Sequence, residues 1–278
     1  MKDDKESFIA FTETSGFDLF QRLSLELYPN YLNLIELCCY HGAVNCFKFL
    51  RTKYNFPITE KCLQYSFLSG NPEIMSECMK VMKPDDSCMR YAIISHNIDF
   101  ICFLMNEHNI KISLESCCEF KNLQAFLVCL DQCFNIGCLF PYSASFNIPS
   151  LCRYLLPFCE DINKKCSNGN TALHYAVEGN SIEIIRLLLS HKAKLNEFTE
   201  TGKTELHIAA ENNCKEVIEL LLSRNNKNYR KSDKTSKTGR GSQFLLLILF
   251  YNIYINTLYN IFYYKIIPQI QIFKILFT

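Results

Sequence analysis

The chain is 278 residues long, and 49% of its residues are hydrophobic while 21% are charged. That composition is rich enough to bury a core and excludes a wholly disordered or collagen-like protein, and the low content of glycine (9) and proline (8) disfavours a turn-rich all-β fold. The formal net charge of +1 is unevenly distributed, since residues 226–278 hold eight basic residues and one acidic residue, against 21 basic and 27 acidic residues before them. An acidic body therefore precedes a basic and then apolar tail.

The chain begins with polar residues of mixed charge and no apolar run, so we expect no secretory signal here and predict a helical lead-in over residues 1–30. Sixteen cysteines follow, none with the CxxC spacing of a zinc knuckle or thioredoxin site. Most lie beside large apolar residues at helical spacing. This spacing predicts that the cysteines are small buried hydrophobic residues of a protein in a reducing, cytoplasmic compartment. Zinc binding and disulfide formation are the weaker alternatives.

Residues 31–157 contain a weak repeat. An apolar helical stretch follows each of a series of asparagines spaced by 26, 25, 25, 33 and 33 residues, namely Asn71, Asn97, Asn122, Asn147, Asn180 and Asn213. Most of them also follow a shorter helical stretch. A spacing of 25–26 residues leaves room for two helices and a tight turn, so residues 31–157 are predicted to form about five short, divergent helix pairs.

A stronger repeat covers residues 158–226, where the segments 171–189 and 204–222 match position by position at an offset of 33 residues. Thr171 and Thr204 are good helix N-caps. Small and apolar residues follow at helical spacing, and they would form one face of each first helix: Leu173, Ala176, Leu206 and Ala209. Neither helix–turn–helix could bury its apolar face alone, so the units are predicted to stack.

These two segments resemble ankyrin repeats, whose pattern T-P-L-H-x-A-A is nearly complete here, with Ala172 and Glu205 in the usual place of proline. The upstream region resembles the uncharacterised helical domain that precedes ankyrin repeats in large protist families, trichomonad ones especially. The stretches that carry this likeness begin at Asn33, Gly70 and Tyr91. The resemblance implies an all-α, ankyrin-type solenoid of stacked helix–turn–helix units.

The repeat pattern breaks near residue 226. Residues 227–243 are predicted to be a basic linker, and residues 244–278 an apolar tail. Within the tail, residues 244–264 carry no charge, and this segment is long enough for a transmembrane helix. The basic residues before it would stay in the cytosol and would keep the repeats there. Two other interpretations are an aberrant reading frame in an AT-rich gene and an apolar cap on the last repeat.

We find no motif for catalysis, metal binding or a cofactor, and neither histidine of the repeats has an evident nucleophile. The ankyrin pattern implies that His174 and His207 bond the backbone near Thr171 and Thr204. The paired acids are best explained as solvated loops. The basic run 227–240 has one aromatic residue and no pattern of aromatic residues for base stacking, so we do not expect it to bind a nucleic acid. We also expect no small-molecule substrate.

The remaining candidates lie on the surface. In ankyrin stacks the hairpin tips and the concave faces of the first helices usually meet partners. For the hairpin tip that we call the first finger, residues 163–168, the resemblance nominates Asn163, Lys164, Lys165, Ser167 and Asn168. For the second finger, residues 197–203, it nominates Glu197, Phe198, Glu200, Thr201 and Lys203. Concave-face candidates are Tyr175, Glu178, Ile208 and Glu211. Phe198 is an apolar residue at a tip and hence a possible anchor, unless its ring folds back onto the neighbouring finger.

The sequence thus predicts a non-catalytic scaffold that binds an unknown protein partner through its fingers and concave surface. The alternative is a membrane-tethered adaptor anchored by residues 244–264, and an enzyme is a remote third possibility.

Overall fold

The computed structural model describes residues 3–18, 20, 32–133 and 135–232. For residues 225–232 it describes the helical backbone only. These residues form helices and turns, and no β-sheet is found among them. The chain divides into two compact units at residues 133 and 134. Each unit is described by itself below.

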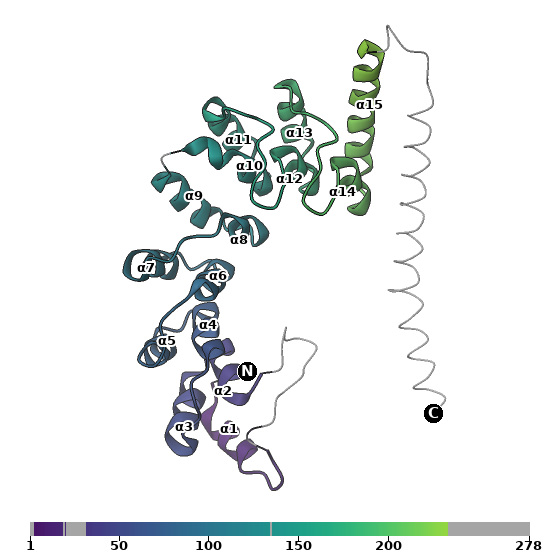
Figure 1. The fold of residues 1–278 in the computed structure, drawn as a ribbon. Helices are drawn as coiled ribbons and strands as arrows, with labels where there is room; N and C mark the ends of the chain where they lie inside the picture. Colours follow the sequence, from purple (N-terminus) through teal and green to yellow (C-terminus); the bar gives the residue numbers. More distant parts are fainter. Residues whose placement is uncertain (1–2, 19, 21–31, 134, 233–278) are drawn as a thin grey trace, which may run out of the picture. The chain divides into compact units, whose positions relative to one another are not determined.

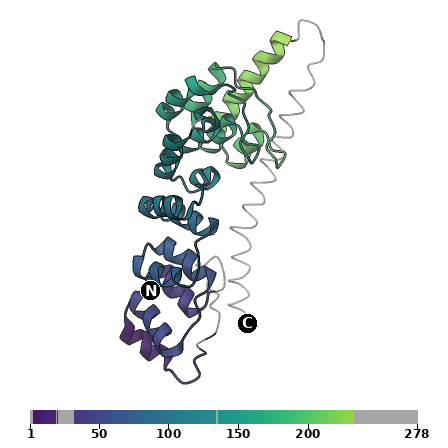
Figure 2. The same ribbon diagram turned by 60° about the vertical axis from the view of Figure 1, so that its left-hand side comes forward.

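The first unit begins with α1 (Lys5–Thr12) and continues as successive helix pairs (Figure 1). The first helix of each pair packs against the first helix of the next. Figure 2 shows the same helices from a second side. The pairs are α2 (Leu34–His41) with α3 (Val44–Tyr54), α4 (Glu60–Ser69) with α5 (Pro72–Met79), α6 (Asp86–Ile94) with α7 (Ile98–His108), and α8 (Leu114–Glu119) with α9 (Leu123–Gln132).

Three of the recurring asparagines begin the second helices of these pairs. Asn71, Asn97 and Asn122 are the N-caps of α5, α7 and α9, and each side chain accepts a hydrogen bond from a backbone amide of the first turn. Asn122 is 1% exposed, and its Nδ2 also donates to the carbonyl of Ile93 in α6, at 2.9 Å. The same side chain therefore begins one helix and ties it to the preceding pair.

The core of the first unit lies along α2, α4 and α6. Tyr65 of α4 is 1% exposed and makes edge contacts with Tyr40 and Tyr91, with ring centroids 5.4 Å apart in each pair. On the surface, ion pairs such as Arg90–Glu119, at 2.8 Å, join neighbouring pairs. These exposed pairs contribute about 1 kcal/mol at most, so burial of apolar side chains supplies most of the stability.

The second unit opens with short helices and ends with the long helix α15 (Lys215–Ser232) (Figure 1). Here the recurring asparagines Asn147, Asn180 and Asn213 have φ of 57°, 52° and 56°, in the left-handed turn between the two helices of a pair. In chain order the elements are η1 (Ile136–Cys138), α10 (Phe140–Ser143), η2 (Ala144–Phe146), α11 (Pro149–Leu155), η3 (Leu156–Phe158), α12 (Ala172–Glu178), α13 (Ile182–Ser190), α14 (Glu205–Glu211) and α15 (Lys215–Ser232).

The last helix corrects one sequence expectation. α15 runs through residue 226 to Ser232, into the segment expected to be a linker from residue 227 onward. No glycine or proline occurs between Gly202 and Gly239, so no helix-ending residue follows the last repeat at the expected place. The rest of that linker and the apolar segment 244–278 lie outside the described residues.

All sixteen cysteines fall within the described residues, and each is a free thiol. Most are buried, and burial raises the pKa of the Cys88 thiol to about 12. A thiol with so high a pKa stays protonated at neutral pH, because the thiolate would lose its hydration. Such cysteines act as small hydrophobic core residues. The described residues also contain no cluster of three or more His, Cys, Asp and Glu side chains that could hold a metal ion.

Candidate functional site

The two fingers are tight turns with the same geometry. In the first, the amide of Cys166 donates to the carbonyl of Asn170 at 2.9 Å, and in the second Thr199 donates to Lys203 at 2.9 Å. Gly169 and Gly202 have φ of 73° and 74°, a left-handed conformation that disfavours any side chain. The repeated turn chemistry therefore gives both fingers one backbone shape.

The second finger rests directly on the first. The ammonium of Lys165 donates to the carbonyl of Phe198 at 2.8 Å and lies 3.1 Å from the carboxylate of Glu197. The amide of Glu200 donates to the carbonyl of Asn168 at 3.4 Å. A Cβ atom on Gly169 would lie 2.6 Å from the amide nitrogen of Glu200, so the close approach of the fingers requires glycine there.

The side chain of His174 binds the backbone of the second finger. Its Nδ1 accepts a hydrogen bond from the amide of Thr171 at 3.1 Å, and therefore its Nε2 carries the proton and donates to the carbonyl of Glu197 at 3.0 Å. The ring is 1% exposed, and burial lowers its pKa. A neutral imidazole thus joins the start of α12 to the second finger.

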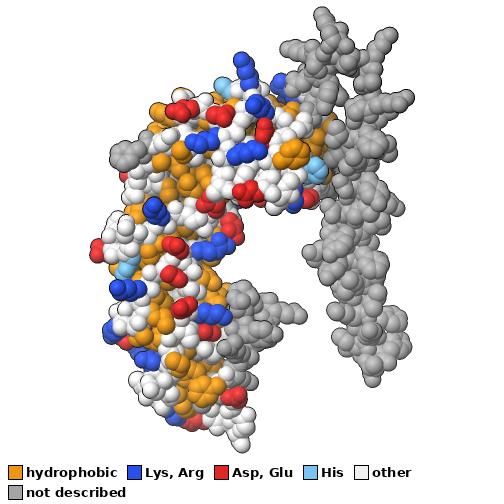
Figure 3. All heavy atoms as spheres, in the orientation of Figure 1, with side chains coloured by type: hydrophobic (Ala, Val, Ile, Leu, Met, Phe, Trp, Pro, Cys, Tyr) orange, Lys and Arg blue, Asp and Glu red, His pale blue; other side chains and the backbone are white. Residues whose placement is uncertain are grey.

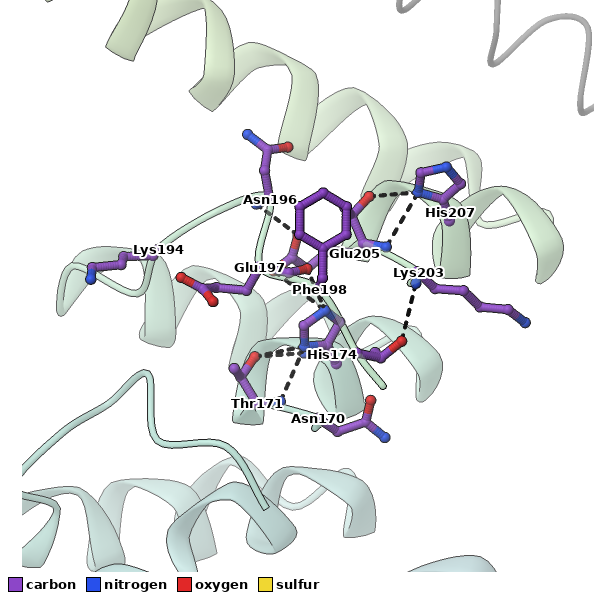
Figure 4. Close-up of polar contacts among 12 residues, drawn as sticks. Asn170, Thr171, His174, Lys194, Asn196, Glu197, Phe198, Lys203, Glu205 and His207 are labelled. Atoms are coloured by element: carbon purple, nitrogen blue, oxygen red, sulfur yellow. Dashed lines mark hydrogen bonds and ion pairs between the residues drawn. The ribbon is translucent and has the colours of Figure 1, made fainter. Parts of the chain in front are cut away.

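The carboxyl group of Glu205 lies beside the imidazole of His174, under the second finger (Figure 4). It occupies the place of the consensus proline at the start of α14 and is only 1% exposed. Its Oε2 accepts a hydrogen bond from the amide of Asn196 at 2.9 Å. Its Oε1 lies 3.7 Å from Nε2 of His174 and has no hydrogen-bond partner among the described residues. Burial raises the pKa of Glu205 to about 7, although backbone amides, including that of Asn196, partly offset this effect.

The importance of Glu205 was missed in the sequence. The only signal in the sequence is an acidic residue directly after the capping threonine, where proline is usual. A carboxylate in the first turn of a helix is ordinarily solvated and favourable. Its burial here follows from the second finger, which covers this end of α14.

Phe198 projects from the finger tip with 59% of its surface exposed. Its ring therefore does not fold back into the stack, while its carbonyl is held by Lys165. An exposed aromatic ring on a hydrogen-bonded backbone loses little conformational entropy on binding.

The other predicted surface residues differ in their availability. Tyr175 is only 6% exposed, and its hydroxyl accepts a hydrogen bond from Nδ2 of Asn168 at 3.0 Å, so it stabilises the first finger from within. Lys203 pairs with Glu211 at 2.8 Å, and Lys164 contacts the sulfur of Cys138 at 3.1 Å. Glu178 and Glu200 are exposed, Ile208 is half-buried, and Figure 3 shows acidic and basic side chains interspersed on the visible face of α10–α15.

The motif residues of both repeats form the same structure. Nδ1 of His207 accepts a hydrogen bond from the amide of Thr204 at 3.2 Å, as His174 does from Thr171. Most of the small and apolar motif residues are buried against neighbouring helices: Leu173, Ala176, Leu206 and Ala209. The two repeats differ at the histidine, because His207 is exposed whereas the second finger covers His174.

Comparison with known families agrees with this geometry. Residues 141–233 match a family model described as ankyrin repeats (three copies). The match starts early enough to include α10, η2 and α11, which the sequence had placed among the short repeats. Together with the helical structure, it confirms the predicted all-α ankyrin-type solenoid. Residues 54–129 match the model of a domain of unknown function (DUF3447).

The order of a DUF3447 domain followed by ankyrin repeats agrees with the resemblance seen in the sequence, and the trichomonad-type assignment stays a prediction. No curated protein sequence matches the chain. Among the described residues, no helix is both long and apolar enough to cross a membrane. The predicted membrane segment 244–264 lies outside those residues.

Proposed function

We propose that this protein is a non-catalytic scaffold that binds a protein partner through the second finger, with Phe198 as the anchor. Ankyrin repeats point in general to protein partners. The observation that carries the proposal is the 59% exposure of Phe198 on a finger whose backbone is already hydrogen-bonded to the first finger and to His174.

The chemistry of the finger tip suits a partner with an apolar pocket and a basic rim. Glu200 is exposed beside Phe198, whereas Glu197 is already engaged with Lys165. An aromatic ring that fills a pocket provides most of the binding energy in many interfaces, and charges at the rim add selectivity. Lys164, Glu178, Ile208 and Glu211 would lie at the edge of such an interface.

The test is quantitative affinity purification of partners from the native cell with the full chain and with Phe198→Ala. Tyr154→Ala is the matched control, because Tyr154 is 61% exposed on α11 but lies outside both fingers. We expect Phe198→Ala to weaken binding of a specific partner about 30-fold, as for a binding hot spot worth about 2 kcal/mol, and Tyr154→Ala to leave it unchanged. Equal recovery of every partner by Phe198→Ala and the full chain, with intact helical content, would refute the role of the finger.

Recruitment of a partner to a membrane is a second proposal, and it depends only on the uncharged sequence of residues 244–264. Carbonate washing of membranes from cells with the full chain, and with a chain ending at Arg240, tests it. Removal of both proteins by the wash would eliminate this proposal while leaving the scaffold function in place.

A further inference from the structure

The base of the second finger contains two titratable groups in the protein interior. Glu205 and His174 are each 1% exposed, and 3.7 Å separates Oε1 of the carboxyl from Nε2 of the ring. Glu205 also binds the amide of Asn196, the residue at which the chain turns into the finger with a φ of 66°. Any change in the charge of Glu205 therefore acts directly on the finger backbone.

The hydrogen bonds determine where an additional proton goes. Nε2–H of His174 already donates to the carbonyl of Glu197 at 3.0 Å, which leaves Oε1 of Glu205 without a hydrogen bond in the described structure. Protonating the ring would place a proton on Nδ1 and break its bond with the amide of Thr171. Protonating Oε1 removes a buried charge and leaves Oε2 as an acceptor for Asn196, so the carboxyl holds the proton.

The charged groups that act on this pair come from the two fingers. Lys165 of the first finger disfavours a positive charge on His174, and Glu197 of the second finger disfavours a negative charge on Glu205. These two side chains lie 3.1 Å apart and pair with each other, which limits their separate influence. Burial is the largest effect on both Glu205 and His174.

We propose that Glu205 is a pH-dependent switch for the second finger, holding it closed on α12 and α14 when protonated and favouring its local opening when ionised. Because the pKa of Glu205 is raised to about 7, the change falls near neutral pH. The control of partner binding by this switch rests on the proposed function of the second finger. The switch itself is a property of the chain alone and can be measured without a partner.

Hydrogen exchange of the amides in residues 194–203 tests the switch in the full chain. Exchange is measured at about pH 6 and about pH 8.5, corrected for intrinsic rates, in the wild type and in Glu205→Gln. We expect the ratio of opening in the wild type to opening in the variant to rise about 10-fold between these pH values. Titration of His174 changes the opening of the finger with pH in the direction opposite to Glu205. Both proteins contain His174, so the ratio of their openings cancels this effect.

Glu219→Gln is the matched control, since it removes an exposed carboxylate on α15 in the same repeat. It should show the wild-type pH dependence. An unchanged ratio for Glu205→Gln across this range would overturn the proposal.

A second measurement needs no variant. The ¹³C shift of the Glu205 carboxyl in the wild-type chain should titrate with a midpoint of about 7, and a midpoint at the ordinary value of 4.5 would overturn the proposal. Neither result depends on whether Phe198→Ala weakens partner binding, so failure of the switch and failure of the scaffold function are distinguishable.

Discussion

Gly169 offers a direct measure of how strongly the two fingers depend on each other. Its φ of 73° is matched by Gly202 at 74°, so an alanine at either position incurs a similar backbone strain of about 1–2 kcal/mol. At Gly169 the new Cβ would also lie 2.6 Å from the amide nitrogen of Glu200, whereas at Gly202 nothing lies within 4 Å. The second finger must then shift away from the first, which adds a cost of about 1–3 kcal/mol.

We therefore expect Gly169→Ala to reduce the free energy of unfolding by about 2–5 kcal/mol and Gly202→Ala by about 1–2 kcal/mol. Urea unfolding followed by circular dichroism provides both values, and the difference between the variants isolates the contact between fingers. Equal losses in the two variants would show that the fingers are not packed at this distance, and the reasoning on the second finger would fail with it.

Two further predictions concern the cores of the two units. Burial raises the pKa of Glu205 from 4.5 to about 7, so ionisation of this carboxyl lowers the free energy of unfolding increasingly as the pH rises from 4.5 to 7. Above pH 7, the free energy of unfolding of Glu205→Gln should exceed that of the wild type by about 3 kcal/mol at most. Thermal melts should show this difference shrinking toward pH 4.5. The lowered pKa of His174 has the opposite sign, because its contribution is lost as pH falls below 6.5, and both proteins share that loss. In the first unit, Asn122→Ala removes a helix cap and one of the two hydrogen bonds to the carbonyl of Ile93, which keeps the amide of His96 as a donor at 3.2 Å. It should therefore cost about 2 kcal/mol in urea unfolding, compared with about 1 kcal/mol for the half-buried cap Asn97, and equal losses would contradict the proposed link between helix pairs.

The recurring asparagines show how far the pattern alone can be followed. Asn97 and Asn122 are N-caps with negative φ, of -89° and -82°, whereas Asn180 and Asn213 have left-handed backbones one position before the cap. Asparagine suits both positions, because its side chain caps helices well and it tolerates positive φ. The spacing revealed the helix pairs, but the residue type could not distinguish the two turn geometries.

The candidate site was predictable in part for similar reasons. The repeated sequence indicated a turn before each capping threonine, since glycine and the capping threonines act locally, but the hydrogen bond that closes the first turn runs from Cys166 to Asn170, beyond the predicted range 163–168. Tyr175 was expected on the concave face but is 6% exposed, because the first finger folds over its hydroxyl. Whether a given residue on a first helix is covered depends on the neighbouring finger, which local periodicity does not describe.

The sequence by itself determined the all-α repeat architecture, because helix periodicity, caps and a 33-residue period all act over short distances. Only the tertiary structure decided that Glu205 is buried beside His174 and that Phe198 stays exposed. Both outcomes arise where one repeat covers the next, and the charge state and exposure of a side chain depend on that covering surface rather than on its own neighbours in the chain.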